Sequence, residues 1–289
     1  MKMFEIVKHY RENKSLRDCF NALAEKTFGL NFEGWYQNGF WKDNYDPYSV
    51  VIDGIVAANV SVNRTDMVIG GERKRLYQLG TVMTEESFRN RGLIRAIMEE
   101  VEKDIRDADG VYLFANDSVV EFYPKFGFRK GMEYVYTKAV EQSGENRMVN
   151  VPMAGPADWA KLQKAMEESV FRGGCDMAGN PGLIFFYVSQ YMQECVFYQA
   201  ELDAYVIAEQ EGGSLLIHNV FCPKQIPLDR VIEAFGADVK QVTLGFAPEN
   251  AGEFEAHQHH EEDTTFFVKG SIFGAFEEKK LRIPSLAHA

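Results

Sequence analysis

A short basic loop with a glycine, set before an amphipathic run, is the first segment whose residues could do chemistry. Arg89, Arg91 and Arg95 surround Gly92, and the amphipathic run begins at Leu93. The start of a helix offers free backbone amides and the positive end of the helix dipole, which attract anions. Gly92 has no Cβ and lets a ligand approach the backbone closely. The loop therefore predicts a phosphate or pyrophosphate site, with an unliganded basic surface loop as the alternative.

A second segment supplies a side-chain amide and a phenol. Asn116 follows a strand predicted over residues 111–115, at a strand end where an amide can meet a ligand. Tyr123 lies near the end of a helix predicted over residues 118–126, and its hydroxyl can donate a proton. The alternative is that Tyr123 and its aromatic neighbours only form part of the core.

The elements that must position these segments alternate between helices and strands. Apolar residues at helical spacing predict helices over 14–27 and 93–106. Asp53-Gly54 predicts the turn of a hairpin over residues 48–62, because this dipeptide favours tight hairpin turns. Further turns and strands are predicted at Gly70-Gly71, over residues 73–83 and over residues 134–139.

The second half of the chain repeats this order of elements without a residue-level repeat. The polar segment 141–147 is the predicted linker between a domain over residues 1–140 and a second domain over residues 148–289. Helices are predicted from Pro156 and over 228–235, a break at 180–182, and strands over 204–210, 215–222, 241–246 and 264–269. An internal duplication is therefore a topological hypothesis.

Composition excludes several classes of protein. Hydrophobic residues make up 46% of the 289 residues, enough to bury a core. The formal net charge of −12 argues against a nucleic-acid binder and against an anionic membrane surface. The charge is compatible with a cationic or amine substrate, with a merely solubilising surface as the alternative.

Cysteine spacing and apolar runs indicate a cytoplasmic protein. The 4 cysteines contain no CxxC pair, so neither a zinc ribbon nor a disulfide framework is expected. Residues 1–6 lack the apolar region of a secretory signal, and the apolar stretch 182–192 is too short to span a bilayer. The histidine-rich run 257–263 is interpreted as a solvated loop, and no metal is predicted.

The two segments together resemble the GNAT N-acetyltransferase superfamily. Arg89-x-x-Gly92-x-Ile94 resembles its acetyl-CoA motif, Arg/Gln-x-x-Gly-x-Gly/Ala, and Asn116, Tyr123 and Gly127-Phe128 resemble its downstream motif. The resemblance covers roughly residues 1–140. It implies an α/β (α+β) fold with a mixed, mostly antiparallel central sheet flanked by helices. It also implies acetyl-CoA as co-substrate and a small-molecule amine as acceptor.

The resemblance gives each matching position a role. Asn116 would contact the cofactor, and Tyr123 would be the general acid that protonates the departing CoA thiolate. Backbone groups at two places would bind the cofactor: Val82, Met83 and Thr84 the pantetheine arm, and Arg89, Asn90, Arg91, Gly92, Leu93, Ile94 and Arg95 the pyrophosphate. Ile94 departs from the motif's Gly or Ala, and either crowds the loop or packs into the core; we favour the core, because Ile94, Ile97 and Met98 form one stripe.

The acceptor pocket and the base are less defined by the motif. The aromatic segment 32–48, predicted as a structured loop with a short helix, corresponds to the loop that commonly lines the acceptor pocket in this superfamily. Candidate acceptor residues are Glu33, Trp35, Tyr36, Trp41 and Gln78. The alternative is that the aromatics only pack this loop onto the sheet.

The second half loosely resembles the second domain of acetyltransferases of the enhanced-intracellular-survival type. It lacks a pyrophosphate loop, so the resemblance implies a smaller, degenerate α/β domain that does not bind CoA. In those proteins the C-terminal carboxylate acts as a base in the active site. We therefore hypothesise that the Ala289 carboxylate reaches Tyr123.

These inferences converge on an acetyl transfer from acetyl-CoA to a primary amine of a cationic small molecule. Three alternatives remain open: a non-catalytic acyl-CoA sensing module, an interaction protein, and a transferase of a longer acyl group. Binding of acetyl-CoA separates the interaction protein from the others.

Overall fold

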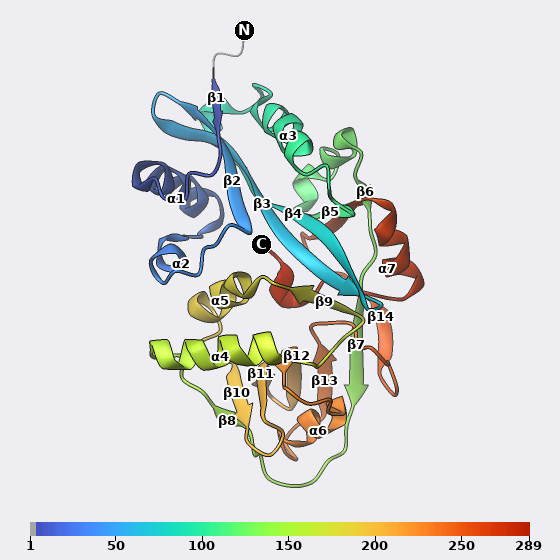
Figure 1. The fold of residues 1–289 in the computed structure, drawn as a ribbon. Coiled ribbons are helices and arrows are strands. Elements are labelled where there is room, and N and C mark those ends of the chain that lie inside the picture. The colour runs from blue at the N-terminus through green and yellow to red at the C-terminus, as the bar shows by residue number, and fades with distance from the viewer. Residues whose placement is uncertain (1–3) are drawn as a thin grey trace.

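Two mixed, mostly antiparallel sheets flanked by helices make up the α+β fold, in a computed structural model that describes residues 4–289 (Figure 1). The first sheet has the order β1 (Glu5–Val7), β2 (Tyr45–Ile52), β3 (Ile55–Ile69), β4 (Glu72–Thr84), β5 (Gly110–Ala115), β15 (Thr265–Lys269) and β6 (Arg129–Lys130), and β9 (Cys175–Ala178) pairs with β3. The second has the order β14 (Glu255–Gln258), β7 (Tyr134–Ala139), β13 (Gln241–Leu244), β12 (Ser214–Phe221), β11 (Ala204–Glu211), β10 (Val196–Gln199) and β8 (Val149–Asn150). The prediction about a secretory signal falls partly on residues 1–3, outside the described residues.

Seven α-helices lie among the described residues. They are α1 (Lys14–Phe28), α2 (Glu33–Gln37), α3 (Leu93–Asp104), α4 (Pro156–Glu168), α5 (Pro181–Gln190), α6 (Leu228–Glu233) and α7 (Gly274–Glu278). The short α2 lies in the aromatic segment, where a short helix was predicted.

Local sequence signals account for several of these boundaries. Asn13 caps α1 by accepting from the Leu16 N–H, and Gly29 ends it in the left-handed conformation. The hairpin turns at Asp53-Gly54 and Gly70-Gly71 have positive φ at both residues, as the sequence predicts. Residues 180–182, predicted as a break, instead form the start of α5, and the Asn180 side chain caps this helix.

The helix predicted over residues 118–126 is wrong. The segment instead forms two short 3₁₀ turns, Asp117–Val119 and Tyr123–Phe126. Pro124 has no backbone N–H, so it cannot make the hydrogen bond that an α-helix would need at that position. Tyr123 is consequently placed by a tight turn and by packing rather than by a helix.

Each half of the chain contributes a strand to the sheet that is formed mainly by the other half. β15 lies between β5 and β6 in the first sheet, while β7 lies between β14 and β13 in the second. The predicted linker at residues 141–147 stays a prediction, and neither sheet is confined to one side of it.

Both sheets contain the same succession of elements. The hairpin β3–β4 is followed by α3 and by β5, which pairs parallel with β4. The hairpin β11–β12 is followed by α6 and by β13, which pairs parallel with β12. This repeated topology supports the hypothesis of an internal duplication.

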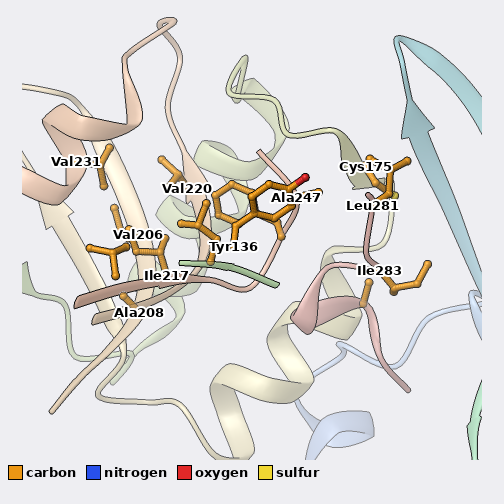
Figure 2. Close-up of a cluster of buried hydrophobic side chains, with 14 of the residues drawn as sticks. Tyr136, Cys175, Val206, Ala208, Ile217, Val220, Val231, Ala247, Leu281 and Ile283 are labelled. Carbon is orange, nitrogen blue, oxygen red and sulfur yellow. The ribbon is translucent and has the colours of Figure 1, made fainter. Parts of the chain in front are cut away.

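The largest buried cluster contains residues of both sheets. Leu76 and Tyr112 of the first sheet and Ile217 of the second are fully buried in it. Figure 2 shows Val206, Ile217 and Val231 of this cluster on one side and Cys175, Leu281 and Ile283 on the other. The segment that carries Leu281 and Ile283 therefore packs between the sheets on its way to the C-terminus.

Candidate active site

A cavity of about 1100 Å³ lies where the first sheet, α5 and the C-terminus meet. Its wall contains all the residues predicted to bind the cofactor, together with Tyr123 and Ala289. Figure 1 shows the C-terminus at the centre of the molecule, between α5 and the first sheet. The structure thus brings the two sequence segments and the chain end to one cavity.

The cavity opens where β4 and β5 stop pairing and separate. They pair only from Leu76 to Gln78, and beyond Gln78 no strand among residues 4–289 pairs with that edge of β4. Thr81 has a φ of 47°, and the β3–β4 register shifts beside it, which marks a β-bulge that redirects the strand. The stretch of β4 from Val82 to Thr84 therefore borders the cavity with one edge unpaired by β5.

The basic loop ends at the N-terminus of α3. Gly92 occupies the N-cap position with a φ of 74°, and no side chain caps the helix. The first turn holds no acidic residue, so the first amides stay available to an anion. Arg89, Arg91 and Arg95 are exposed and line this end of the cavity.

Ile94 borders the loop and the core at once. It is partly buried, packs against the core cluster that contains Ile97 and Met98, and also lines the cavity. This packing is the arrangement that the stripe of apolar residues favours.

Asn116 is held from the second half of the chain. It is exposed at the end of β5, and its side-chain N–H donates to the Asp263 carboxylate at 2.9 Å. The backbone N–H of Asp117 donates to the other oxygen of Asp263 at 2.7 Å. The amide thus has a fixed orientation at the cavity wall, set by the loop that precedes β15.

Tyr123 is 4% exposed and is surrounded by aromatic rings. Its ring centroid lies 5.6 Å from that of Phe267 on β15 and 5.4 Å from that of Phe122. This burial raises the pKa of Tyr123 to about 12, because a phenolate would lose its hydration. The hydroxyl therefore stays protonated at any ordinary pH.

Side chains of both halves hold the last three carbonyl groups of the chain. Tyr112 donates to the Ala287 oxygen at 2.9 Å, and Tyr187 to the His288 oxygen at 2.7 Å. Gln78 donates to the Ala289 oxygen at 2.8 Å.

Gly80 lies directly against the terminal residue, Ala289. A Cβ at this position would lie 2.3 Å from the Ala289 oxygen. Only glycine leaves room for the terminal residue against β4.

The predicted acceptor residues divide into two groups. Trp35 and Gln78 line the cavity, whereas Glu33, Tyr36 and Trp41 do not. Glu33 pairs with the buried Arg17 at 3.1 Å, which holds the pKa of Glu33 below its usual range.

Tyr36 and Trp41 have packing contacts that keep them away from the cavity. The Arg17 guanidinium lies 3.6 Å from the centre of the Tyr36 ring. The Trp41 ring N–H donates to the Tyr45 backbone oxygen at 2.8 Å. The Trp41 ring stacks on that of Trp35, with 5.6 Å between the ring centroids. For these two aromatics the packing alternative describes their position, and an acceptor role for them stays a prediction.

Sequence reasoning missed several residues of the wall. Phe186, Tyr187 and Tyr191 come from α5 and its end, and Glu261 and His288 from near the C-terminus. The apolar stretch 182–192 was weighed only as a membrane span. Asn180-Pro181 before it, a helix-start signal, could have marked it as a buried helix.

Residues 4–289 offer neither a metal site nor a membrane-spanning helix. No group of three or more His, Cys, Asp or Glu side chains there could hold a metal ion. No helix in that range is both long and apolar enough to cross a membrane.

These features define a class. Residues 11–131 match the model of the acetyltransferase (GNAT) domain, so this part of the chain is a GNAT domain, the domain of acyl-CoA-dependent N-acyltransferases. Among curated protein sequences, none matches this chain.

Solved structures share the fold over most of the chain. A conserved protein of unknown function from Enterococcus faecalis V583 superposes with a TM-score of 0.59 at 15% identity, covering 96% of this chain and 75% of that one. A GCN5-related N-acetyltransferase from Kribbella flavida has a TM-score of 0.55 at 16% identity, with 92% and 71% covered. Eis1 from Mycobacterium abscessus has a TM-score of 0.51 at 13% identity, with 91% and 73% covered. The two-sheet, two-half architecture is thus that of GNAT structures.

Proposed function

We propose that the protein transfers an acetyl group from acetyl-CoA to a primary amine of a cationic small molecule. The observation that carries the proposal is that one cavity joins the uncapped N-terminus of α3, the unpaired edge of β4 and the largely buried side chain of Tyr123. The helix end suits a pyrophosphate, and the strand edge suits an extended amide-bearing arm.

The chemistry is direct attack on the thioester. The neutral amine adds to the carbonyl carbon, and the C–S bond of the resulting intermediate then breaks. Tyr123 gives its proton to the departing thiolate and is reprotonated from solvent. The new amide nitrogen loses its extra proton to a base.

The Ala289 carboxylate is the base in this proposal. It lines the cavity with Tyr123, and Gln78 orients one of its oxygens. The role requires Ala289 to be the last residue of the mature chain, which an intact mass measurement establishes. Extending the chain by a few residues should then abolish turnover and leave acetyl-CoA binding in place. Full activity of a C-terminally extended enzyme would exclude this role.

Calorimetric titration with acetyl-CoA tests the proposal. We expect binding by the wild type and its loss in Gly92→Glu, because a carboxylate at the helix N-terminus opposes a pyrophosphate. Gly54→Glu is the matched control, since both glycines have positive φ and open space around the Cβ position. Thiol release with a panel of amines follows, and competition with longer acyl-CoA esters settles the acyl group. No binding by the wild type, or equal binding by Gly92→Glu, would contradict the proposal.

A further inference from the structure

We infer that the acceptor is an amine with a single cationic centre on an apolar, aromatic or aliphatic body, and not a polyamine. This inference rests on the proposed function, because it specifies the acceptor of the same site. It comes from the wall of the cavity that faces α1, α2 and α5.

This wall is built from aromatic residues that are distant in the sequence. Phe32 and Trp35 come from the first half, and Phe186, Tyr187 and Tyr191 from α5 and its end. The Phe186 ring lies 5.3 Å from Phe32 and 5.5 Å from Trp35. The rings hold one another in place and form a preformed apolar surface.

Few charged groups line the cavity, and the three arginines and the Ala289 carboxylate already have a place in the proposed function. The three arginines of the lining all belong to the loop before α3 or to its first turn. Glu261 is the one carboxylate side chain that lines the cavity among residues 4–289, and together with burial its charge raises the pKa of Tyr187 on the aromatic wall. Ala289 packs against the same aromatic cluster, and in the proposed function its carboxylate takes up the proton of the reacting amine. A second ammonium group among Phe32, Trp35 and Phe186 would therefore have no further anionic partner, which is unfavourable.

The rings are also poorly placed to bind a cation through their faces. Phe32 and Phe186 stack at an interplanar angle of 16°, and Trp35 and Trp41 at 18°. One face of each ring is thus already covered by a neighbour. Ring edges carry partial positive charge, so a wall that uses its faces internally is better suited to hydrocarbon than to a cation.

The mouth of the cavity shows the same character. Phe28, Val119 and Tyr191 are 42%, 41% and 60% exposed, and all three line this cavity. An apolar acceptor body that covers these side chains would remove apolar surface from water, which favours binding.

A matched pair of amines tests the inference. Hexylamine and 1,6-diaminohexane have the same chain length, and the second replaces the terminal methyl group by an ammonium group. With acetyl-CoA saturating, we expect kcat/KM from thiol release to be at least about tenfold higher for hexylamine, after correction for the two reactive ends of the diamine.

Tyr191→Glu provides a change in the opposite direction. A carboxylate at this exposed position should shift the preference toward the diamine by about threefold, the scale of an exposed ion pair. Val149→Glu is the control, because Val149 is 64% exposed on β8 and does not line the cavity. The control should leave the ratio unchanged.

The outcomes separate this inference from the proposed function. Equal or faster turnover of the diamine by the wild type overturns the inference alone. Binding of acetyl-CoA without turnover of either amine also overturns it and leaves the cofactor site standing. Failure to bind acetyl-CoA overturns the proposed function itself.

Discussion

Tyr123 owes its proposed role to the aromatic rings that bury it. The same burial that raises its pKa to about 12 would also raise the pKa of a thiolate formed beside it, so donor and acceptor shift in the same direction. Phe267, one of these rings, belongs to β15. The acidity of the group at the reacting centre thus depends on a strand from the other end of the chain.

Removal of the Tyr123 hydroxyl tests its chemical role. In Tyr123→Phe we expect kcat to fall by about 10²- to 10⁴-fold, the range of general acid catalysis, while the affinity for acetyl-CoA changes little. Steady-state kinetics with calorimetric binding measures both. Unchanged kcat would indicate another proton donor, and an unchanged unfolding temperature would show that packing is preserved.

The contact between Gly80 and the terminal residue can be tested without touching either proposed catalytic group. In Gly80→Ala the added methyl group would lie 2.3 Å from the Ala289 oxygen, so the terminal residue must move. We expect kcat to fall by at least about tenfold, because a base that is displaced from the reacting amine can no longer accept its proton. Gly274→Ala is the control, since Gly274 has open space at its Cβ position. Equal turnover by both variants would mean that the position of Ala289 is unimportant.

At the scale of elements, the two halves exchange equivalent strands. β15 pairs antiparallel with β5, and β7 pairs antiparallel with β13, each next to the strand that follows the helix of its sheet. Each half therefore supplies the neighbour of the other's central parallel pair. The exchange also brings Asp263 to Asn116 and Phe267 to Tyr123.

Because of this exchange, we expect that cutting the predicted linker does not separate the two halves. A protease site inserted after Ser143, which is exposed, would divide the chain between the halves. We expect the cleaved protein to elute as one species in gel filtration, because β7 and β15 still pair across the cut. Residues 1–140 produced alone should show no cooperative thermal transition, since they lack β9 and β15. Two separated and folded pieces would show independent domains instead.

At the scale of the whole molecule, a buried carboxyl group lies where the chain crosses between the sheets. Glu133 precedes β7, and its side chain accepts the backbone N–H of Ile283 at 2.6 Å. Burial raises the pKa of Glu133 to about 7, although the charge of Arg282 opposes the shift. The crossing is thus tied to the segment that leads to the cavity.

The stability of the protein should reflect this group. The folded state holds the proton of Glu133 more tightly than the unfolded state, whose ordinary pKa is 4.5. The stabilisation is complete below that pH and is lost as the pH rises through about 7, a loss of at most about 3 kcal/mol. Urea unfolding of the wild type and Glu133→Gln between pH 4.5 and 8 measures the difference. Parallel curves would contradict this expectation.

How much of the fold and of the site the sequence predicts depends on how far apart along the chain the interacting residues are. The loop around Gly92, the cap of α1 and the hairpin turns are local, and the sequence predicts all three. The strand over 264–269 was also predicted, but alternation along a strand does not indicate its sheet. Its place beside β5 depends on contacts with residues about 150 positions away.

The aromatic wall escaped prediction for a related reason. Phe186, Tyr187 and Tyr191 belong to a helix whose buried residues surround it, so no amphipathic stripe marks the side that faces the cavity. The helix predicted over residues 118–126 was wrong because the prediction rested on Ser118 as a possible N-cap and did not take Pro124 into account. Both errors concern residues at the site itself.

The position of β15 also has a consequence for the order of biosynthesis. β5 leaves the ribosome about 150 residues before β15, which at roughly 5–20 residues per second is an interval of roughly 8–30 seconds. During that time one edge of β5 lacks its final partner, and an open edge can pair with another nascent chain. Synonymous codon changes that slow translation between residues 140 and 260 would therefore lower the yield of the folded protein without altering a single amino acid.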